Sequence, residues 1–274
     1  MTHSVQDKRA AFRRLHAQGC FVLPNPWDVG SAKMLQGLGF KALATTSSGH
    51  AWSQGQADGA LSRAIVLSHL RTIVAATDLP VNADFESGFA SNPEGVAESV
   101  RMAVDTGVAG ISIEDSTGDA NYPLRDVDEA VARLRAARTA IDDSGGDVLL
   151  IGRAENFFAG HPDLDDTLSR LRAYAEAGAD CLYAPGIRTR EQIVAVVAAV
   201  APKPVNLLIG WASEFTLQDV AAMGVRRVSV GGALARAAWG GFLRAARGIA
   251  EDGRFDGFAD ATSGKELDAF FGRA

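Results

Sequence analysis

The sequence predicts a single (β/α)8 barrel followed by a helical extension at its C-terminal end. Strand-like apolar runs alternate with helix-like runs eight times over roughly 230 of the 274 residues, which suits such a barrel. The strand-like runs are continuously apolar, as parallel strands are when helices cover both faces. A doubly wound open sheet is the alternative. It is disfavoured because Pro24-Asn25-Pro26 follows the first strand, where that fold would carry a GxGxxG turn.

The elements follow in a regular order after a polar leading helix over residues 5–18. The predicted strands cover residues 20–23, 42–45, 81–84, 110–114, 148–151, 181–183, 204–208 and 228–230. A polar, glycine-rich loop is expected over residues 47–59. One helix opens at Asn92-Pro93, with proline in the first turn as helices favour, and ends before Gly107. The other helices are predicted over residues 29–36, 62–76, 126–141, 163–177, 190–200, 216–223 and 233–249, and the helix over 126–141 carries one apolar stripe.

Composition and charge exclude several classes of binding partner. A 47% hydrophobic chain of this length can bury a large core. A net charge of −6 without a dense Lys/Arg cluster argues against binding to nucleic acid or to an anionic membrane surface. The longest apolar run, residues 193–201, is too short to span a bilayer, and the first 19 residues lack an export signal. We expect a cytoplasmic protein with a small-molecule partner, in which Cys20 and Cys181 pack as thiols without forming a disulfide.

The end of the chain is predicted to be separate from the barrel domain of residues 1–252. Residues 253–274 carry aromatic and aliphatic side chains among charged ones, and these would expose apolar surface on a lone barrel. We therefore expect this tail to be helical and to pack on a neighbouring subunit. The apolar residues are Phe255, Phe258, Leu267, Phe270 and Phe271.

Acidic side chains gather where the predicted strands end. Asp84 and Glu86 stand two residues apart, so on an extended chain they point the same way. Glu114 ends the fourth strand, Arg153 follows the fifth, and Asn206 lies in the seventh. The C-terminal strand ends of such a barrel form one face, where the chemistry lies. Several acids beside one arginine are costly without a cation, and Mg²⁺ prefers carboxylates, waters and substrate oxygens.

Each of these residues also has a purely structural interpretation. Glu114 or Asp115 could cap the following segment, and Arg153 could be a structural ion-pair partner. His50 could be a solvated histidine in the loop after the second strand. That loop also contributes the polar residues Ser47, Ser48, Gly49 and Asp58.

The motifs resemble those of the isocitrate lyase and phosphoenolpyruvate mutase superfamily. Residues 82–89, NADFESGF, are similar to its D-x-D-x-G-[YF]-G metal motif, and residues 110–115, GISIED, to its G-x-x-x-E-D strand. Ser48-Gly49 with Asp58 resembles the substrate loop after strand two. Arg153 stands at the position of the superfamily's arginine, and residues 204–206 fit its seventh strand.

The resemblance implies an enzyme that uses Mg²⁺, with Mn²⁺ as an alternative, to stabilise the enolate of a 2-oxo acid. It also implies a homotetramer whose C-terminal helices swap between subunits. Asp84 would hold the metal directly or through water, with Glu86 and Glu114 completing the metal site. The implied catalytic residues are Arg153, Glu114 and Asp58, and the implied substrate-binding residues are Ser47, Ser48, Gly49, His50, Arg153 and Asn206.

Departures from the superfamily pattern limit which of its reactions this chain is expected to catalyse. The lyases carry a K-[KR]-C-G-H loop with a catalytic cysteine, whereas residues 116–125 contain neither cysteine nor histidine. The mutases use lysine, asparagine and serine there, and only Asn121 could stand in. Glu86 also replaces the usual aspartate. We therefore expect a carbon–carbon lyase or decarboxylase acting on an oxaloacetate-like 2-oxo acid. Carbon–phosphorus chemistry on phosphonopyruvate and metabolite binding without catalysis are the alternatives.

Overall fold

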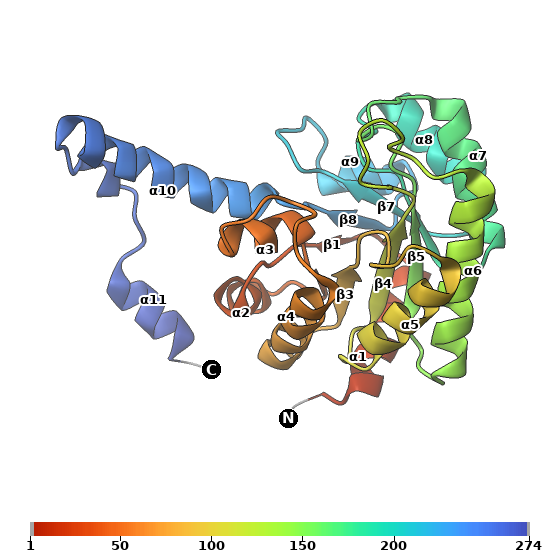
Figure 1. Ribbon diagram of the computed structural model, residues 1–274. Helices are drawn as coiled ribbons and strands as arrows, with labels where there is room; N and C mark the ends of the chain where they lie inside the picture. Colours follow the sequence, from red (N-terminus) through yellow and green to blue (C-terminus); the bar gives the residue numbers. More distant parts are fainter. Residues whose placement is uncertain (1–2, 273–274) are drawn as a thin grey trace.

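The computed structural model describes residues 3–272, and its centre is an eight-stranded parallel barrel (Figure 1). The strands pair in the order β1-β8-β7-β6-β5-β4-β3-β2, which confirms the predicted barrel. An open doubly wound sheet is excluded, since β1 and β8 are neighbours. The strands are β1 (Phe21–Leu23), β2 (Leu43–Ala44), β3 (Val81–Asp84), β4 (Gly110–Glu114), β5 (Leu149–Arg153), β6 (Cys181–Tyr183), β7 (Val205–Leu208) and β8 (Arg227–Ser229).

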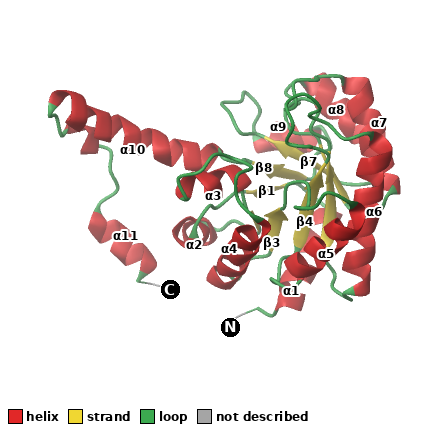
Figure 2. Cartoon of the chain, in the orientation of Figure 1, coloured by secondary structure: helices red, strands yellow, loops and turns green. Residues whose placement is uncertain are grey.

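Helices surround the strands and bury the apolar core between the two layers (Figure 2). Most expected helices begin and end within a few residues of the observed ones. None of the helices described is long and apolar enough to cross a membrane. The helices are α1 (Val5–Ala17), α2 (Val29–Gly37), α3 (Ser47–Ser53), α4 (Arg63–Ala76), α5 (Pro93–Val104), α6 (Val127–Asp143), α7 (Leu164–Glu176), α8 (Arg190–Val200), α9 (Leu217–Ala222), α10 (Ala233–Asp252) and α11 (Gly264–Phe271), with a 3₁₀ turn η1 at Asp256–Phe258.

Helix α1 lies against the N-terminal ends of the strands. Lys8 donates to the carbonyl oxygens of Val74 and Thr77, just before β3, and Arg9 donates to those of Val104 and Val108, just before β4. These bonds satisfy two buried cations with backbone acceptors. They leave the opposite end of the barrel, where the strands finish, free to carry a site.

The barrel closes at Asn25, the centre of the Pro24-Asn25-Pro26 turn. Its side-chain Nδ2 donates to the carbonyl oxygen of Thr45 at 2.9 Å, while its Oδ1 accepts from the amides of Val230 and Gly231 at 2.9 Å each. The amide of Ala44 also donates to the carbonyl of Pro24 at 3.1 Å. The Asn25 carboxamide thus links the segments that follow β1, β2 and β8. It does so at the place where β1 and β2 do not pair as strands.

The loop expected over residues 47–59 contains a short helix, α3, so that part of the prediction is wrong. Thr46 caps the helix by accepting from the amide of Gly49 at 3.3 Å. The polar, glycine-containing sequence hid this helix because such residues favour caps and turns in general. Gly49 is needed for packing, since a Cβ there would lie 2.7 Å from Cγ2 of Thr46 and 3.1 Å from Cβ of Trp27.

Helix α10 differs from the eighth barrel helix that was expected over residues 233–249. It continues to Asp252, ends at the left-handed Gly253, and projects away from the barrel (Figure 1). Ala235 is its one buried residue, whereas Trp239 and Phe242 on the same helix are exposed. The chain then returns, and α11 reaches α2 of its own chain, where the ring of Phe270 lies against Gly37. The projecting arm therefore begins within the segment that the sequence assigned to the barrel.

Candidate active site

A cavity of about 850 Å³ opens at the C-terminal ends of the strands, where barrel enzymes carry their chemistry. Every strand from β3 to β8 contributes an end residue to its lining. Five acids and four arginines line the cavity, and Arg153 is the arginine that forms ion pairs with these acids. The acids are Asp58, Asp84, Glu86, Glu114 and Glu155, and the other arginines are Arg188, Arg227 and Arg236.

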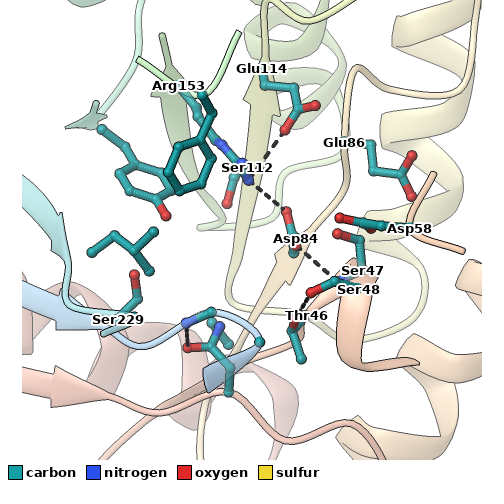
Figure 3. A pocket seen from close by; sticks show the side chains of 18 of the residues that line it. Thr46, Ser47, Ser48, Asp58, Asp84, Glu86, Ser112, Glu114, Arg153 and Ser229 are labelled. Carbon is teal, nitrogen blue, oxygen red and sulfur yellow. Dashed lines mark hydrogen bonds and ion pairs between the residues drawn. The ribbon is translucent and has the colours of Figure 1, made fainter. Parts of the chain in front are cut away.

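Arg153 at the end of β5 links the carboxylates at the ends of the neighbouring strands (Figure 3). Its Nη1 lies 3.2 Å from Oδ1 of Asp84 and 3.2 Å from Oε2 of Glu114. Its Nε donates to Glu155, and its guanidinium lies 5.2 Å from the centre of the Tyr183 ring. The sequence prediction that these residues meet is confirmed, and Arg153 is indeed an ion-pair partner. One guanidinium carries a single charge, however, so it does not balance the three carboxylates that it contacts.

Burial and neighbouring negative charge raise the pKa values of two of these acids. Burial, followed by the charges of Asp84 and Asp58, raises the pKa of Glu86 to about 7, while Arg153 opposes the shift. Burial also raises the pKa of Glu114 well above its ordinary value; Arg153 opposes that shift, while Glu155 and Asp84 add to it. Both carboxyl groups would be stabilised in their ionised form by a nearby cation.

Glu86 reaches the cavity through a left-handed turn. The strand ends at Asp84, and Glu86 has a φ of 48°, which is uncommon for a residue other than glycine. Its carbonyl accepts from the amide of Glu114 at 3.0 Å, which holds this conformation. Both acids line the cavity as expected, but they do not lie on one extended strand, because the chain turns between them.

The segment after β2 brings Ser47, Ser48 and Asp58 to the cavity. The amide of Ser47 donates to Oδ2 of Asp84 at 2.9 Å, so α3 begins directly on the central carboxylate. Asp58 lies at the rim and stays exposed. The amide of Gly49 is occupied by Thr46, and Gly49 is not part of the cavity lining.

His50 lies outside the cavity, which corrects its predicted role in substrate binding. It is buried between α3 and α4, where its ring stacks on that of His69 with centroids 3.6 Å apart and planes 11° apart. Consecutive helical residues are about 100° apart around the axis, so two residues are about 200° apart. The helix that points Ser48 toward the cavity therefore points His50 away from it.

The floor of the cavity is polar although it lies inside the barrel. Asn206, predicted to bind substrate, lines it and is fully buried. Ser112, Tyr183, Arg227 and Ser229 line it too and were not predicted from the sequence. Side chains alternate along a strand, so two polar residues two positions apart in an otherwise apolar strand point to the same side. This pattern could have predicted most of these lining residues, and it occurs in Asn82/Asp84, Ser112/Glu114 and Arg227/Ser229.

The loop over residues 116–125 folds back on itself, with a bridge between Ser116 and Leu124. Neither cysteine of the chain lines the cavity, and Asn121 is exposed and outside it. At its base, the buried carboxylate of Asp115 accepts from the hydroxyl of Tyr174 at 2.6 Å and the amide of Glu155 at 2.8 Å. Asp115 is thus an anchor between two strand ends rather than a cap of the next segment.

The donor set fits a hard divalent ion bound mainly through water. Within residues 3–272, no three His, Cys, Asp or Glu side chains converge closely enough to hold a metal together. Direct binding of one ion by Asp84, Glu86 and Glu114 together is therefore not the arrangement seen. Mg²⁺ commonly takes one or two carboxylates and keeps several waters, which suits Asp84 with other acids around it.

Comparison with known proteins agrees with this geometry. A family model described as phosphoenolpyruvate phosphomutase matches residues 12–250. The chain belongs to the phosphoenolpyruvate mutase family. This membership confirms the resemblance to the isocitrate lyase and phosphoenolpyruvate mutase superfamily that its motifs suggested.

Three relatives of this phosphoenolpyruvate mutase family chain are informative. A crystal structure from Burkholderia cenocepacia J2315, assigned only broadly to the lyases and mutases, is 47% identical with a TM-score of 0.95 and covers 98% of this chain and 97% of that one. An oxaloacetate acetylhydrolase solved with its product oxalate is 28% identical, with a TM-score of 0.85 and coverage of 97% and 94%. An oxaloacetate decarboxylase of Paraburkholderia xenovorans is 30% identical over 81% of this chain and 74% of that protein.

The stacked histidines predict a pH-dependent stability. Burial, with a contribution from His50, lowers the pKa of His69 to about 3, while Asp28 opposes the shift. Between pH 6.5 and 3 the unfolded chain therefore binds a proton at His69 that the folded protein excludes. Stability should fall on acidification by up to about 1.4 kcal/mol per pH unit from this group alone. Urea unfolding of the wild type and His69→Gln at pH 7, 6 and 5 measures the difference.

The variant should lose less stability than the wild type over this range, because glutamine does not titrate. Parallel declines of the two unfolding free energies would show that His69 is not held neutral in the fold.

Proposed function

We propose that this protein is a Mg²⁺-dependent carbon–carbon lyase acting on a small 2-oxo acid such as oxaloacetate. The observation that carries the proposal is the placement of Asp84, Glu114 and Arg153 at adjacent strand ends, with unbalanced negative charge in a cavity large enough for a substrate. The names of the oxaloacetate decarboxylase and oxaloacetate acetylhydrolase relatives support this substrate class.

Asp84 would hold the ion, and Glu86, Asp58 and Glu114 would accept hydrogen bonds from its waters. When bound, the ion would supply positive charge to the keto oxygen of the substrate, which is worth several kcal/mol in such reactions. Mn²⁺ offers the same oxygen-ligand chemistry. Arg153 keeps Asp84 and Glu114 aligned and adds a charge facing the same region.

The reaction that fits these residues best is decarboxylation of oxaloacetate. The bond between C3 and C4 breaks, CO₂ leaves, and the electron pair passes to the C2–C3 enolate, which then takes a proton at C3 to give pyruvate. No cysteine acid is needed for this sequence. Ser47, Ser48 and Asn206 line the cavity where the substrate oxygens would lie, and they offer neutral hydrogen-bond donors to a carboxylate.

Phosphonopyruvate chemistry is the second candidate, because the matching family model is described as phosphoenolpyruvate phosphomutase. The geometry favours it less, since Asn121 lies outside the cavity. A protein that binds metabolites without turning them over is the third. All three share the metal-holding cavity, so a substrate panel is needed to separate them.

A steady-state assay over oxaloacetate, other 2-oxo acids and phosphonopyruvate, with and without EDTA, tests the proposal. Oxaloacetate should be turned over with Mg²⁺, and EDTA or Asp84→Asn should lower kcat/KM by at least about 100-fold, because the enolate loses its counter-charge. Asp105→Asn removes an exposed carboxylate at the C-terminal end of α5, outside the cavity, and serves as the control for the same change of side chain.

EDTA-resistant turnover, or equal activity of the Asp84→Asn and Asp105→Asn variants, would contradict the metal-dependent mechanism. Release of phosphate or formation of phosphoenolpyruvate from phosphonopyruvate would favour the second candidate. Tight oxalate binding without turnover of any compound would favour the third.

We also infer a homotetramer in which residues 253–274, together with the projecting part of α10, pack on a neighbouring subunit. The support is the apolar surface left on the arm, where Trp239, Phe242, Phe255 and Phe258 are all exposed by more than a third. Burial of such a surface is a normal source of subunit association.

Deletion of residues 253–274 should reduce the mass in solution, because it removes part of the contact surface. Light scattering coupled to gel filtration measures that mass, and thermal unfolding reports stability in parallel. An unchanged mass together with an unchanged Tm would contradict the predicted role of the tail.

A further inference from the structure

Arg227 is a buried cation that the active-site chemistry above does not use. It begins β8, lines the floor of the cavity and is only 2% exposed. Among residues 3–272, no carboxylate lies within ion-pair distance of it, although seven other arginines before residue 253 have such partners. A buried guanidinium without an acid is costly, so its hydrogen bonds should have a purpose.

The guanidinium binds three neutral acceptors. Its Nε donates to Oδ1 of Asn206 at 2.8 Å, and its Nη1 lies 3.3 Å from Oδ1 of Asn82 and 3.3 Å from Nε2 of His16. The Nδ1 of His16 lies 2.8 Å from the carbonyl oxygen of Phe12 and must donate to it, which leaves Nε2 as an acceptor. Burial, followed by the charge of Arg227, lowers the pKa of His16 to about 3, in keeping with this neutral tautomer.

These bonds fix the orientation of two carboxamides on β3 and β7. Because both Oδ1 atoms face Arg227, both Nδ2 groups must face away from it. Asn82 donates to Oγ of Ser112 at 2.9 Å, and Asn206 donates to Oγ of Ser229 at 3.0 Å. Without the guanidinium, either carboxamide could turn over and present an oxygen instead.

Two hydrogen-bonded arms thus leave Arg227, one through Asn82 to Ser112 and one through Asn206 to Ser229. They differ at their outer ends. The hydroxyl of Ser112 also donates to the carbonyl oxygen of Ala83 at 3.2 Å, so that arm closes on the backbone. Ser229 lines the cavity (Figure 3), and its hydroxyl accepts from Asn206, which leaves its proton to be donated. The arm through Asn206 and Ser229 is therefore the one that can present N–H and O–H donors to a ligand.

We propose that Arg227 is a positioning residue that acts through Asn206 and Ser229, and that this arm binds a carboxylate oxygen of the substrate at the cavity floor. The inference rests on the proposed function, because it assigns this floor to the same 2-oxo acid. A cation beneath the carboxamide polarises the chain of hydrogen bonds and strengthens its outer donor. The floor is thus a donor surface, while the acids at the rim form an acceptor surface.

A double-mutant cycle between Arg227→Met and Asn206→Ala tests the proposal. Calorimetry would measure oxalate binding in saturating Mg²⁺, and kinetics would give KM and kcat for oxaloacetate. Each single variant should weaken oxalate binding roughly ten- to hundred-fold, the range for a lost charge-assisted hydrogen bond. The double variant should be no weaker than the worse single one, because both changes break the same arm.

Arg226→Met is the matched control. Arg226 is the adjacent residue, and its guanidinium donates to the carbonyl oxygen of Gly19 at 2.6 Å outside the cavity. The oxalate dissociation constant of the Arg226→Met variant should be within about twofold of the wild-type value, as expected for a change away from the site. Arg227→Lys covers the case in which Arg227→Met does not fold: lysine keeps the buried charge but cannot hold two carboxamides as a planar guanidinium does, so oxalate binding should still weaken.

The outcomes are distinct. Full oxalate affinity in the folded Arg227 variants, or additive losses in the double variant, would overturn the positioning role while leaving the proposed function intact. Absence of both oxalate binding and turnover in the wild type would instead overturn the proposed function, and this inference with it.

Discussion

The contact between Arg153 and the carboxylates of Asp84 and Glu114 is the interaction on which the site depends. It holds the ends of β3, β4 and β5 in one charge cluster, with both Nη1 contacts at 3.2 Å. One guanidinium does not balance the three carboxylates that it contacts, and burial together with the charges of Asp84 and Asp58 raises the pKa of the neighbouring Glu86. An incoming dication would complete the balance, and the keto acid oxygens that it attracts would then lie over the cavity floor.

The scaffold keeps these charges in place by satisfying polar groups elsewhere. Asn25 closes the barrel seam with three backbone bonds beside the cavity, and Asp115 ties the end of β4 to the start of the segment after β5. At the other end, backbone carbonyls accept hydrogen bonds from Lys8 and Arg9, the two buried cations of α1. The cavity lies between these fixed ends, with acids at its rim and hydrogen-bond donors on its floor.

Much of the fold and the rim of the site could be predicted from sequence, because a parallel barrel places all strand ends on one face. Asp84, Glu114 and Arg153 are strand-end residues and met as expected. Features set by local turns could not be derived in this way. Glu86 arrives through a left-handed residue, and α3 turns His50 toward His69. Arg227 escaped notice because a charge at the start of an apolar strand looks like a surface residue until the barrel closes around it.

The most direct measurement of the central claim is anomalous scattering from crystals grown with Mn²⁺ and oxalate. We expect a strong anomalous peak in the cavity at coordination distance from a carboxylate oxygen of Asp84, with oxalate bound to the ion, and we expect Asp84→Asn to lose the peak. A cavity without such a peak, or an ion bound away from Asp84, would contradict the claim that charge balance by a dication organises this site.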